Sequence, residues 1–247
     1  MKFKTIIWLT IFSIAMGFME SAVVIYLREL YYPQGFKFPL VPLDTGIGLV
    51  ELFREVATII MLLGVGILSA KTTALRLAHF IFCFAVWDIF YYIFLYVFLG
   101  WPESLLTWDI LFLIPVPWVG PVLTPIIVSM TMILLAVSIM HFQRLGLDTR
   151  LKVKEWGLFS SGSFVIILSF VWDYWRYIRN ITLSAIANPQ SGKQELFSEL
   201  KDYIPVDFNW PLFIAGEAIL LYGILIFIRR INLDYRAIYS ILNPCSS

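Results

Sequence analysis

Six mainly apolar stretches, each long enough to cross a bilayer as a helix, constrain this chain more than any other feature. They lie at about 5–27, 48–70, 77–99, 120–141, 157–179 and 210–229. A transmembrane helix needs about 20 such residues, and lipid offers no partners to unpaired backbone groups. Charged residues make up 14% of the chain, against about 25% in a typical soluble domain. The sequence therefore predicts an all-α integral membrane protein, with residues 1–247 forming one polytopic domain built on a bundle of six transmembrane helices.

The charges between these stretches predict an orientation. Eleven of the 18 basic residues fall on one side: Lys2, Lys4, Lys71, Arg76, Arg144, Arg150, Lys152, Lys154, Arg229, Arg230 and Arg236. By the positive-inside rule this side is cytoplasmic. Both termini are then cytoplasmic, the loops at 28–47, 100–119 and 180–209 are external, and the expected location is the plasma membrane. Within the last loop, residues 191–194 read Ser-Gly-Lys-Gln, which predicts a capping box that opens a short helix.

The segment 101–119 interrupts the helical pattern. It is apolar and aromatic, but prolines stand at 102, 115 and 117, and another follows at 121. Proline removes a backbone donor and clashes with the preceding helical turn. One helix from Leu105 to His141 would also be about 55 Å long, against a hydrocarbon core of about 30 Å. We therefore expect 101–119 to be irregular or half-helical, as a re-entrant or capping segment over the outer face.

Seven acidic residues lie within the apolar stretches or at the mouth of the bundle: Glu20, Glu51, Glu55, Asp88, Asp109, Asp173 and Glu217. At about 1.5 Å per residue, those within the stretches fall in the outer half of the membrane. An ionised side chain at a helix centre costs about 2.5–3.5 kcal/mol on insertion scales, so these groups should face the interior of the bundle. We predict that four of them line one pocket that opens outward: Glu20, Glu55, Asp88 and Glu217.

A second set of residues is expected to support this pocket: Glu51, Arg54, Asp109, Asp173, Arg176, Tyr92 and Tyr177. Two similar octapeptides, 86–93 (VWDIFYYI) and 171–178 (VWDYWRYI), each place a tyrosine four residues after an aspartate. Such pairs share a helix face, so each phenol can donate to the carboxylate. The alternative is a purely structural role for these residues: an ion-pair clamp of Arg54 with Glu51 and Glu55, and a structural Asp173–Arg176 pair.

The acids outnumber these arginines, so the pocket requires protons, water or a bound cation. A cofactor, if one is bound, would be a divalent cation held by carboxylates, because His79 and His141 lie near the cytoplasmic ends. The sequence has no haem, nicotinamide or flavin motif. Farther from the acids, glycines such as Gly64, Gly66, Gly157 and Gly162 predict tightly packed inner halves.

Three functions are compatible with this pattern. The favoured one is an outward-opening, carboxylate- and aromatic-lined pocket that binds or acts on a lipid-like or small substrate, using protonated acids or a divalent cation. The alternatives are a structural or accessory subunit of a membrane complex and a cation- or proton-coupled transporter. The expected partners are the bilayer and a lipid-like or small ligand, with no nucleic acid. Whether the chain is an enzyme stays open.

Overall fold

The computed structural model describes residues 3–41, 44–113, 116–187 and 203–242. These form α1 (Phe3–Tyr31), α2 (Thr45–Ser69), α3 (Thr73–Leu99), β1 (Trp108–Phe112), β2 (Trp118–Pro121), α4 (Leu123–Arg144), α5 (Val153–Ala187) and α6 (Trp210–Leu242). All six helices are long and apolar enough to cross a membrane, and each overlaps one of the predicted stretches. Length and composition thus identify an integral membrane protein. The capping box predicted at 191–194 lies outside the described residues.

Local sequence explains where α3 begins and ends. The hydroxyl of Thr72 accepts a hydrogen bond from the Leu75 amide at 3.4 Å, so Thr72 is the N-cap. At the other end Gly100 adopts φ +63°, a left-handed conformation that favours glycine, and its amide donates to the Tyr96 carbonyl. Pro102 follows and cannot continue the helix. The chain therefore leaves α3 just before the segment that forms the strands.

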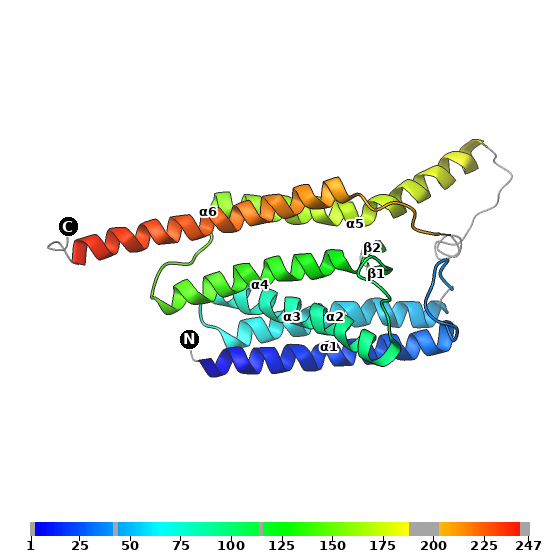
Figure 1. The fold of residues 1–247 in the computed structure, drawn as a ribbon, viewed down its shortest axis with the longest axis horizontal. Coiled ribbons are helices and arrows are strands. Elements are labelled where there is room, and N and C mark those ends of the chain that lie inside the picture. The colour runs from blue at the N-terminus through cyan, green and yellow to red at the C-terminus, as the bar shows by residue number, and fades with distance from the viewer. Residues whose placement is uncertain (1–2, 42–43, 114–115, 188–202, 243–247) are drawn as a thin grey trace.

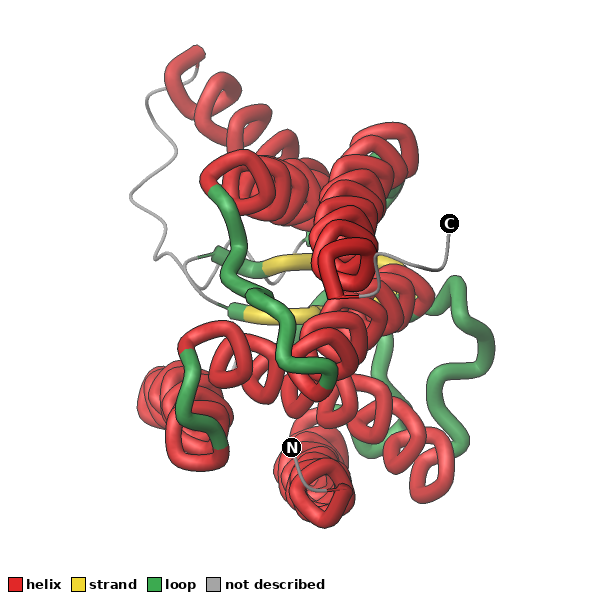
Figure 2. Tube along the Cα trace, turned by 90° about the vertical axis from the view of Figure 1, so that its left-hand side faces the viewer, coloured by secondary structure: helices red, strands yellow, loops and turns green. Residues whose placement is uncertain are grey.

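The helices fall into two groups (Figures 1 and 2). In the first, α3 packs against α1, α2 and α4; in the second, α5 packs against α6. Glycines allow close approach within each group: a Cβ on Gly66 would lie 2.9 Å from the Arg76 carbonyl, and one on Gly162 would lie 2.7 Å from Leu220. Two larger clusters of buried apolar side chains form the core: one joins α1–α4 and includes Phe227 and Ile231 of α6, and the other lies mainly between α5 and α6. The groups meet along α4 and α6 and where β2 contacts α5.

Within the proline-rich segment two short strands form a hairpin where the sequence predicts irregular or half-helical structure, whereas the described chain as a whole is mostly helical, as predicted. Strands β1 and β2 are antiparallel, with Trp108 opposite Pro121 and Phe112 opposite Trp118. The strand residues are largely aromatic and β-branched, types that favour extended backbone. Pairing satisfies backbone groups that have few other partners among apolar helices. Helix α4 begins only at Leu123, so no single helix runs from 105 to 141.

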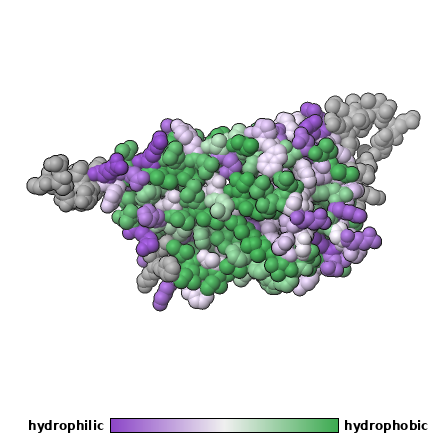
Figure 3. Space-filling model, in the orientation of Figure 1, coloured by the Kyte–Doolittle hydropathy of each residue, from purple (hydrophilic) through white to green (hydrophobic). Residues whose placement is uncertain are grey.

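On the face drawn in Figure 3, apolar residues cover the middle of the molecule and polar residues gather toward both ends. Helix α1 begins and α6 ends at the same end, here called the termini end (Figure 1). The hairpin and the segments 32–41 and 203–209 lie at the opposite end, here called the hairpin end. Which end faces the cytoplasm stays a prediction from the loop charges.

Candidate functional site

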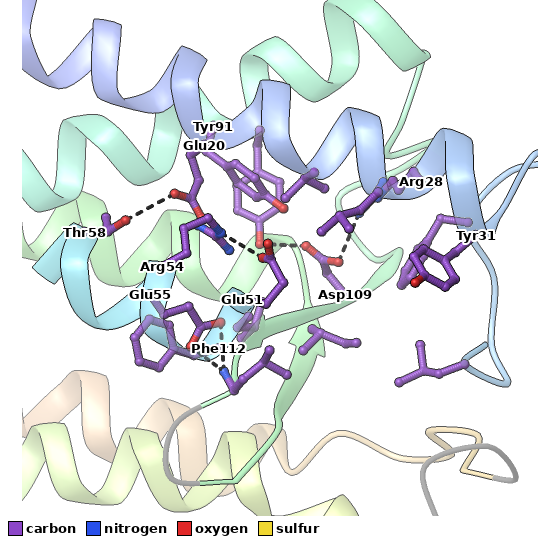
Figure 4. A pocket seen from close by; sticks show the side chains of 18 of the residues that line it. Glu20, Arg28, Tyr31, Glu51, Arg54, Glu55, Thr58, Tyr91, Asp109 and Phe112 are labelled. Atoms are coloured by element: carbon purple, nitrogen blue, oxygen red, sulfur yellow. Dashed lines mark hydrogen bonds and ion pairs between the residues drawn. The ribbon is translucent and has the colours of Figure 1, made fainter. Parts of the chain in front are cut away.

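A cavity of about 220 Å³ lies at the hairpin end, between α1, α2, α3 and β1. We call it the acid cavity. Its titratable lining groups, several of which are drawn in Figure 4, include five acids and two arginines. They are Glu20, Glu51, Glu55, Asp88 and Asp109 with Arg28 and Arg54. The structure thus brings together three of the four predicted pocket acids and four of the supporting residues, Glu51, Arg54, Asp109 and Tyr92.

Arg54 bridges two helices at the centre of this cavity. Its Nη1 donates to Glu20 Oε1 on α1, and its Nε donates to Glu51 Oε2 on α2 at 2.7 Å (Figure 4). Thr58 donates to the other Glu20 oxygen at 3.4 Å. The Glu51–Arg54 pair has the predicted i,i+3 spacing, whereas the contact with Glu20 spans 34 residues of sequence. One guanidinium therefore serves two carboxylates, which leaves this cluster with one negative charge when all three are ionised.

Glu55 connects α2 to the hairpin instead of pairing with Arg54. Its two carboxylate oxygens accept the Leu113 amide at 3.2 and 3.1 Å. Leu113 directly follows β1, so its amide belongs to a backbone that leaves the strand pairing. The hairpin thus supplies a donor to an acid that the sequence placed beside Arg54.

Arg28 is a cavity residue that the sequence reasoning missed. Its Nη2 contacts Asp109 Oδ1 at 3.3 Å, and Tyr92 donates to Asp109 Oδ2 at 3.2 Å. The guanidinium also lies over the ring of Trp101 at 3.7 Å and the ring of Phe36 at 4.4 Å, a favourable arrangement for a cation. The apolar pattern predicts a first span that ends at 27 and an external loop from 28, whereas α1 continues to Tyr31 and includes Arg28.

Asp109 is fully enclosed in this arrangement and not solvated at a membrane surface. Only 2% of the residue is exposed. Burial raises the pKa of its carboxyl, and the nearby Arg28, the Ile110 amide and the Tyr92 phenol oppose that rise. The proposed Asp88–Tyr92 pair does not form, because the Tyr92 phenol donates to Asp109.

Asp88 lies where the acid cavity adjoins a second, larger space. Its Oδ2 accepts a hydrogen bond from Ser129 of α4 at 2.9 Å. The second space has a volume of about 590 Å³ and is lined mainly by apolar side chains of α3, α4 and α5. We call it the apolar groove. Four residues line both spaces: Trp87, Asp88, Leu111 and Phe112.

The apolar groove corrects the expectation of tightly packed inner halves. It extends along α5 from Phe170 to Trp156, near the termini end. Gly66 and Gly162 do bring helices together, but each does so within its own helix group. Gly64 and Gly157 would have nothing within 4 Å of an added Cβ. The open space lies between the two helix groups. Glycine spacing within one helix does not predict the distance between groups.

Glu217 does not join the predicted constellation. It is buried in α6, where Oε2 accepts a hydrogen bond from Thr131 of α4 at 2.8 Å. Among the described residues its Oε1 has no hydrogen-bond partner, and Glu217 lines neither of the two cavities described here. The sequence prediction used the depth of Glu217 but could not identify the helix face on which it lies.

The supporting residues of α5 form a separate cluster at the hairpin end. The Asp173 carboxylate accepts from the Tyr203 phenol at 2.8 Å and from the Val206 amide at 3.3 Å. Burial and the neighbouring Asp173 raise the pKa of Tyr203. Tyr177 packs against the same ring, with centroids 5.1 Å apart, and Arg176 is exposed. Asp173, Arg176 and Tyr177 are thus outside the acid cavity.

The described residues include no group of three or more His, Cys, Asp or Glu side chains arranged to hold a metal ion. No family model matches the chain, and neither the curated proteins nor the solved structures give a significant match. The geometry of the two cavities is therefore the basis on which a function can be inferred.

Proposed function

We propose that this membrane protein binds a lipid-like amphiphile, with the polar end in the acid cavity and the hydrocarbon chain in the apolar groove. The observation that carries the proposal is the shared wall of Trp87, Asp88, Leu111 and Phe112, which places a small space that contains charged side chains directly beside a long apolar one. Ligand pockets typically measure about 300–1,000 Å³. The two spaces taken together fall within that range, whereas the acid cavity alone is smaller.

The groove has the length that an acyl or isoprenoid chain requires. Its lining on α5 runs from Trp156 to Phe170, about 21 Å at 1.5 Å per residue. That distance is about two thirds of the hydrocarbon thickness of a bilayer. Because lipid already solvates such a chain, packing against protein rather than escape from water must provide the preference for the groove.

The carboxyl surplus of the acid cavity determines how a ligand would be held or acted on. Five acids face two arginines, so protons, a divalent cation or ligand donors must compensate. A protonated acid close to the bound head group would also be able to act as a general acid. Binding is the part of this function that the geometry supports best, and chemistry on the ligand would use the same groups.

A photoactivatable amphiphile tests the proposal. The purified protein in nanodiscs is labelled with a monoacylglycerol that carries a diazirine on its chain, and the modified peptides are mapped by mass spectrometry. We expect labelling of the groove faces of α3, α4 and α5. Ser163→Phe should reduce that labelling at least fivefold, because Ser163 lines the groove. Ser161→Phe is the matched control, since Ser161 is exposed on the same helix and is not among the groove residues. Equal labelling of both variants would refute the site.

Transport of the ligand is a second candidate that the groove favours over the accessory-subunit alternative. A closed inner half would argue against transport, and the groove instead reaches Trp156 near the termini end. Proteoliposomes with a fluorescent amphiphile in one leaflet would test this function. Transfer to the other leaflet that Ser163→Phe slows and Ser161→Phe does not would support transport, whereas binding without transfer would exclude it for that amphiphile.

A further inference from the structure

Arg28 leaves one buried donor unused in the acid cavity. Its Nη2 pairs with Asp109, but in the described part of the chain its Nη1 has no hydrogen-bond partner. The side chain is only 9% exposed and is enclosed by the rings of Trp101 and Phe36. An unpaired buried donor on a charged group costs free energy, because it has lost its hydrogen bonds to water without gaining others. A ligand atom that accepts a hydrogen bond at this position would remove that cost.

The acids that line the same cavity as Arg28 offer hydrogen-bond acceptors instead of a donor. Asp88 accepts one hydrogen bond from Ser129, and Asp109 accepts from Arg28, from Tyr92 and from the Ile110 amide. A carboxylate has about four acceptor sites, so both retain acceptor capacity toward the cavity. The complementary head group must therefore accept from Arg28 and donate to a carboxyl group.

We infer that the head group is uncharged and carries hydroxyl groups, as in a monoacylglycerol or a glycolipid. This inference depends on the proposed amphiphile site. A hydroxyl group both donates and accepts, so it satisfies Arg28 and an acid together. A carboxylate or phosphate head group would be repelled by the surplus of acids. An ammonium head group would provide no hydrogen-bond acceptor for Arg28.

The size of the acid cavity agrees with such a head group. Its volume of about 220 Å³ is below the range of complete ligand pockets, so it has room for a glycerol or one sugar ring but not for a large oligosaccharide. The ring of Tyr31 and the apolar Phe112 side chain border the same space (Figure 4). The head group would thus have polar contacts on one side and ring faces on another.

Three amphiphiles with the same twelve-carbon chain separate the head-group classes. Protein in nanodiscs is titrated with 1-monolaurin, laurate or dodecylamine, and each is measured by displacement of the diazirine probe. We expect 1-monolaurin to displace the probe at a concentration at least tenfold lower than the other two. Free glycerol should displace it weakly, because it lacks the chain; displacement by glycerol at the concentration of 1-monolaurin would assign the site to a soluble polyol instead.

A pair of double variants tests the role of Arg28. Arg28→Gln with Asp109→Asn removes both charges together and should raise the 1-monolaurin concentration needed at least tenfold, with less than a twofold effect on laurate and dodecylamine. Arg150→Gln with Asp148→Asn is the control, because that Arg–Asp pair is exposed and lines neither cavity. Arg28→Lys is a second variant that keeps the charge but loses the planar guanidinium, and it should weaken 1-monolaurin as well.

The outcomes distinguish this inference from the proposed function. Stronger displacement by dodecylamine or laurate would overturn the uncharged head group while leaving an amphiphile site. Unchanged 1-monolaurin binding in a folded Arg28 variant would overturn the role of Arg28. Failure of every amphiphile, together with equal labelling of Ser163→Phe and Ser161→Phe, would overturn the proposed function itself.

Discussion

The acid cavity and the apolar groove share a wall but are organised differently. In the acid cavity, ion pairs join neighbouring elements: Arg54 of α2 reaches Glu20 of α1, and Arg28 of α1 reaches Asp109 of β1. The groove lies instead between two helix groups, which meet where α4 contacts α6 and where β2 contacts α5. Substitutions in the acid cavity should therefore change stability as well as binding. Substitutions along the groove should change binding with little effect on stability.

The largest expected effect concerns the side of the membrane to which the acid cavity opens. The loop charges predict that the termini end is cytoplasmic and the hairpin end external. A single cysteine at position 150, in a chain whose own cysteines are replaced by serine, should react with a membrane-impermeant maleimide only after cells are opened. A cysteine at position 34 should react in intact cells. Labelling of position 150 in intact cells would show that both cavities have the opposite orientation to the predicted one.

The next effect tests whether ion pairs hold the acid cavity together. Arg54→Ala leaves Glu20 and Glu51 without their shared partner, and removing one member of a buried pair costs about 3–5 kcal/mol. Because the Arg54 side chain retains 20% exposure, we expect about 3 kcal/mol, measured as the free energy of unfolding in detergent. Arg150→Ala should cost less than about 1 kcal/mol, since its partner Asp148 is also exposed. Equal losses would mean that Arg54 has no special structural role.

A smaller effect should appear in the pH dependence of stability. Burial raises the pKa of Asp109 above its ordinary value. A carboxyl with a higher pKa in the folded state binds more protons when folded, so its contribution is present at low pH and is lost as pH rises through the folded pKa. The wild type should lose stability relative to Asp109→Asn as pH increases from about 4, by about 1.4 kcal/mol for each unit of pKa difference. The exposed-site variant Asp148→Asn should show no such trend.

The sequence predicted the helices and part of the acid cavity for physical reasons. Apolar length alone indicates a span, and the i,i+3 spacing of Glu51 and Arg54 requires only helical geometry. Depth also grouped Glu20, Glu55 and Asp88, which line one cavity in the structure. Asp109 was predicted as a supporting residue at the mouth of the bundle, and its partner Arg28 was not identified.

Features that depend on tertiary placement could not be obtained in this way. Depth does not report helix phase, and Glu217 therefore has the right height but points to Thr131. The hairpin could not be distinguished from a broken helix, since prolines exclude a continuous helix without specifying its replacement. The apolar groove depends on how far apart two helix groups lie, and neither composition nor glycine spacing contains that distance.

The smallest predicted effect comes from a comparison of two buried acids. Asp88 lines both cavities, and Glu217 lines neither. Asp88→Asn retains an oxygen to accept from Ser129 but removes a carboxylate that lines the acid cavity. We expect it to weaken displacement by 1-monolaurin about tenfold, which corresponds to about 1.4 kcal/mol.

Glu217→Gln likewise retains an oxygen for Thr131, and it changes an atom that has no partner among the described residues. Its free energy of unfolding should change by less than about 1 kcal/mol, because loss of a buried charge offsets the new amide, and its 1-monolaurin affinity should match the wild type. A loss of affinity in Glu217→Gln as large as that in Asp88→Asn would show that the binding site extends past the two cavities to Glu217, although only Leu220 and Ile224 of α6 line the groove.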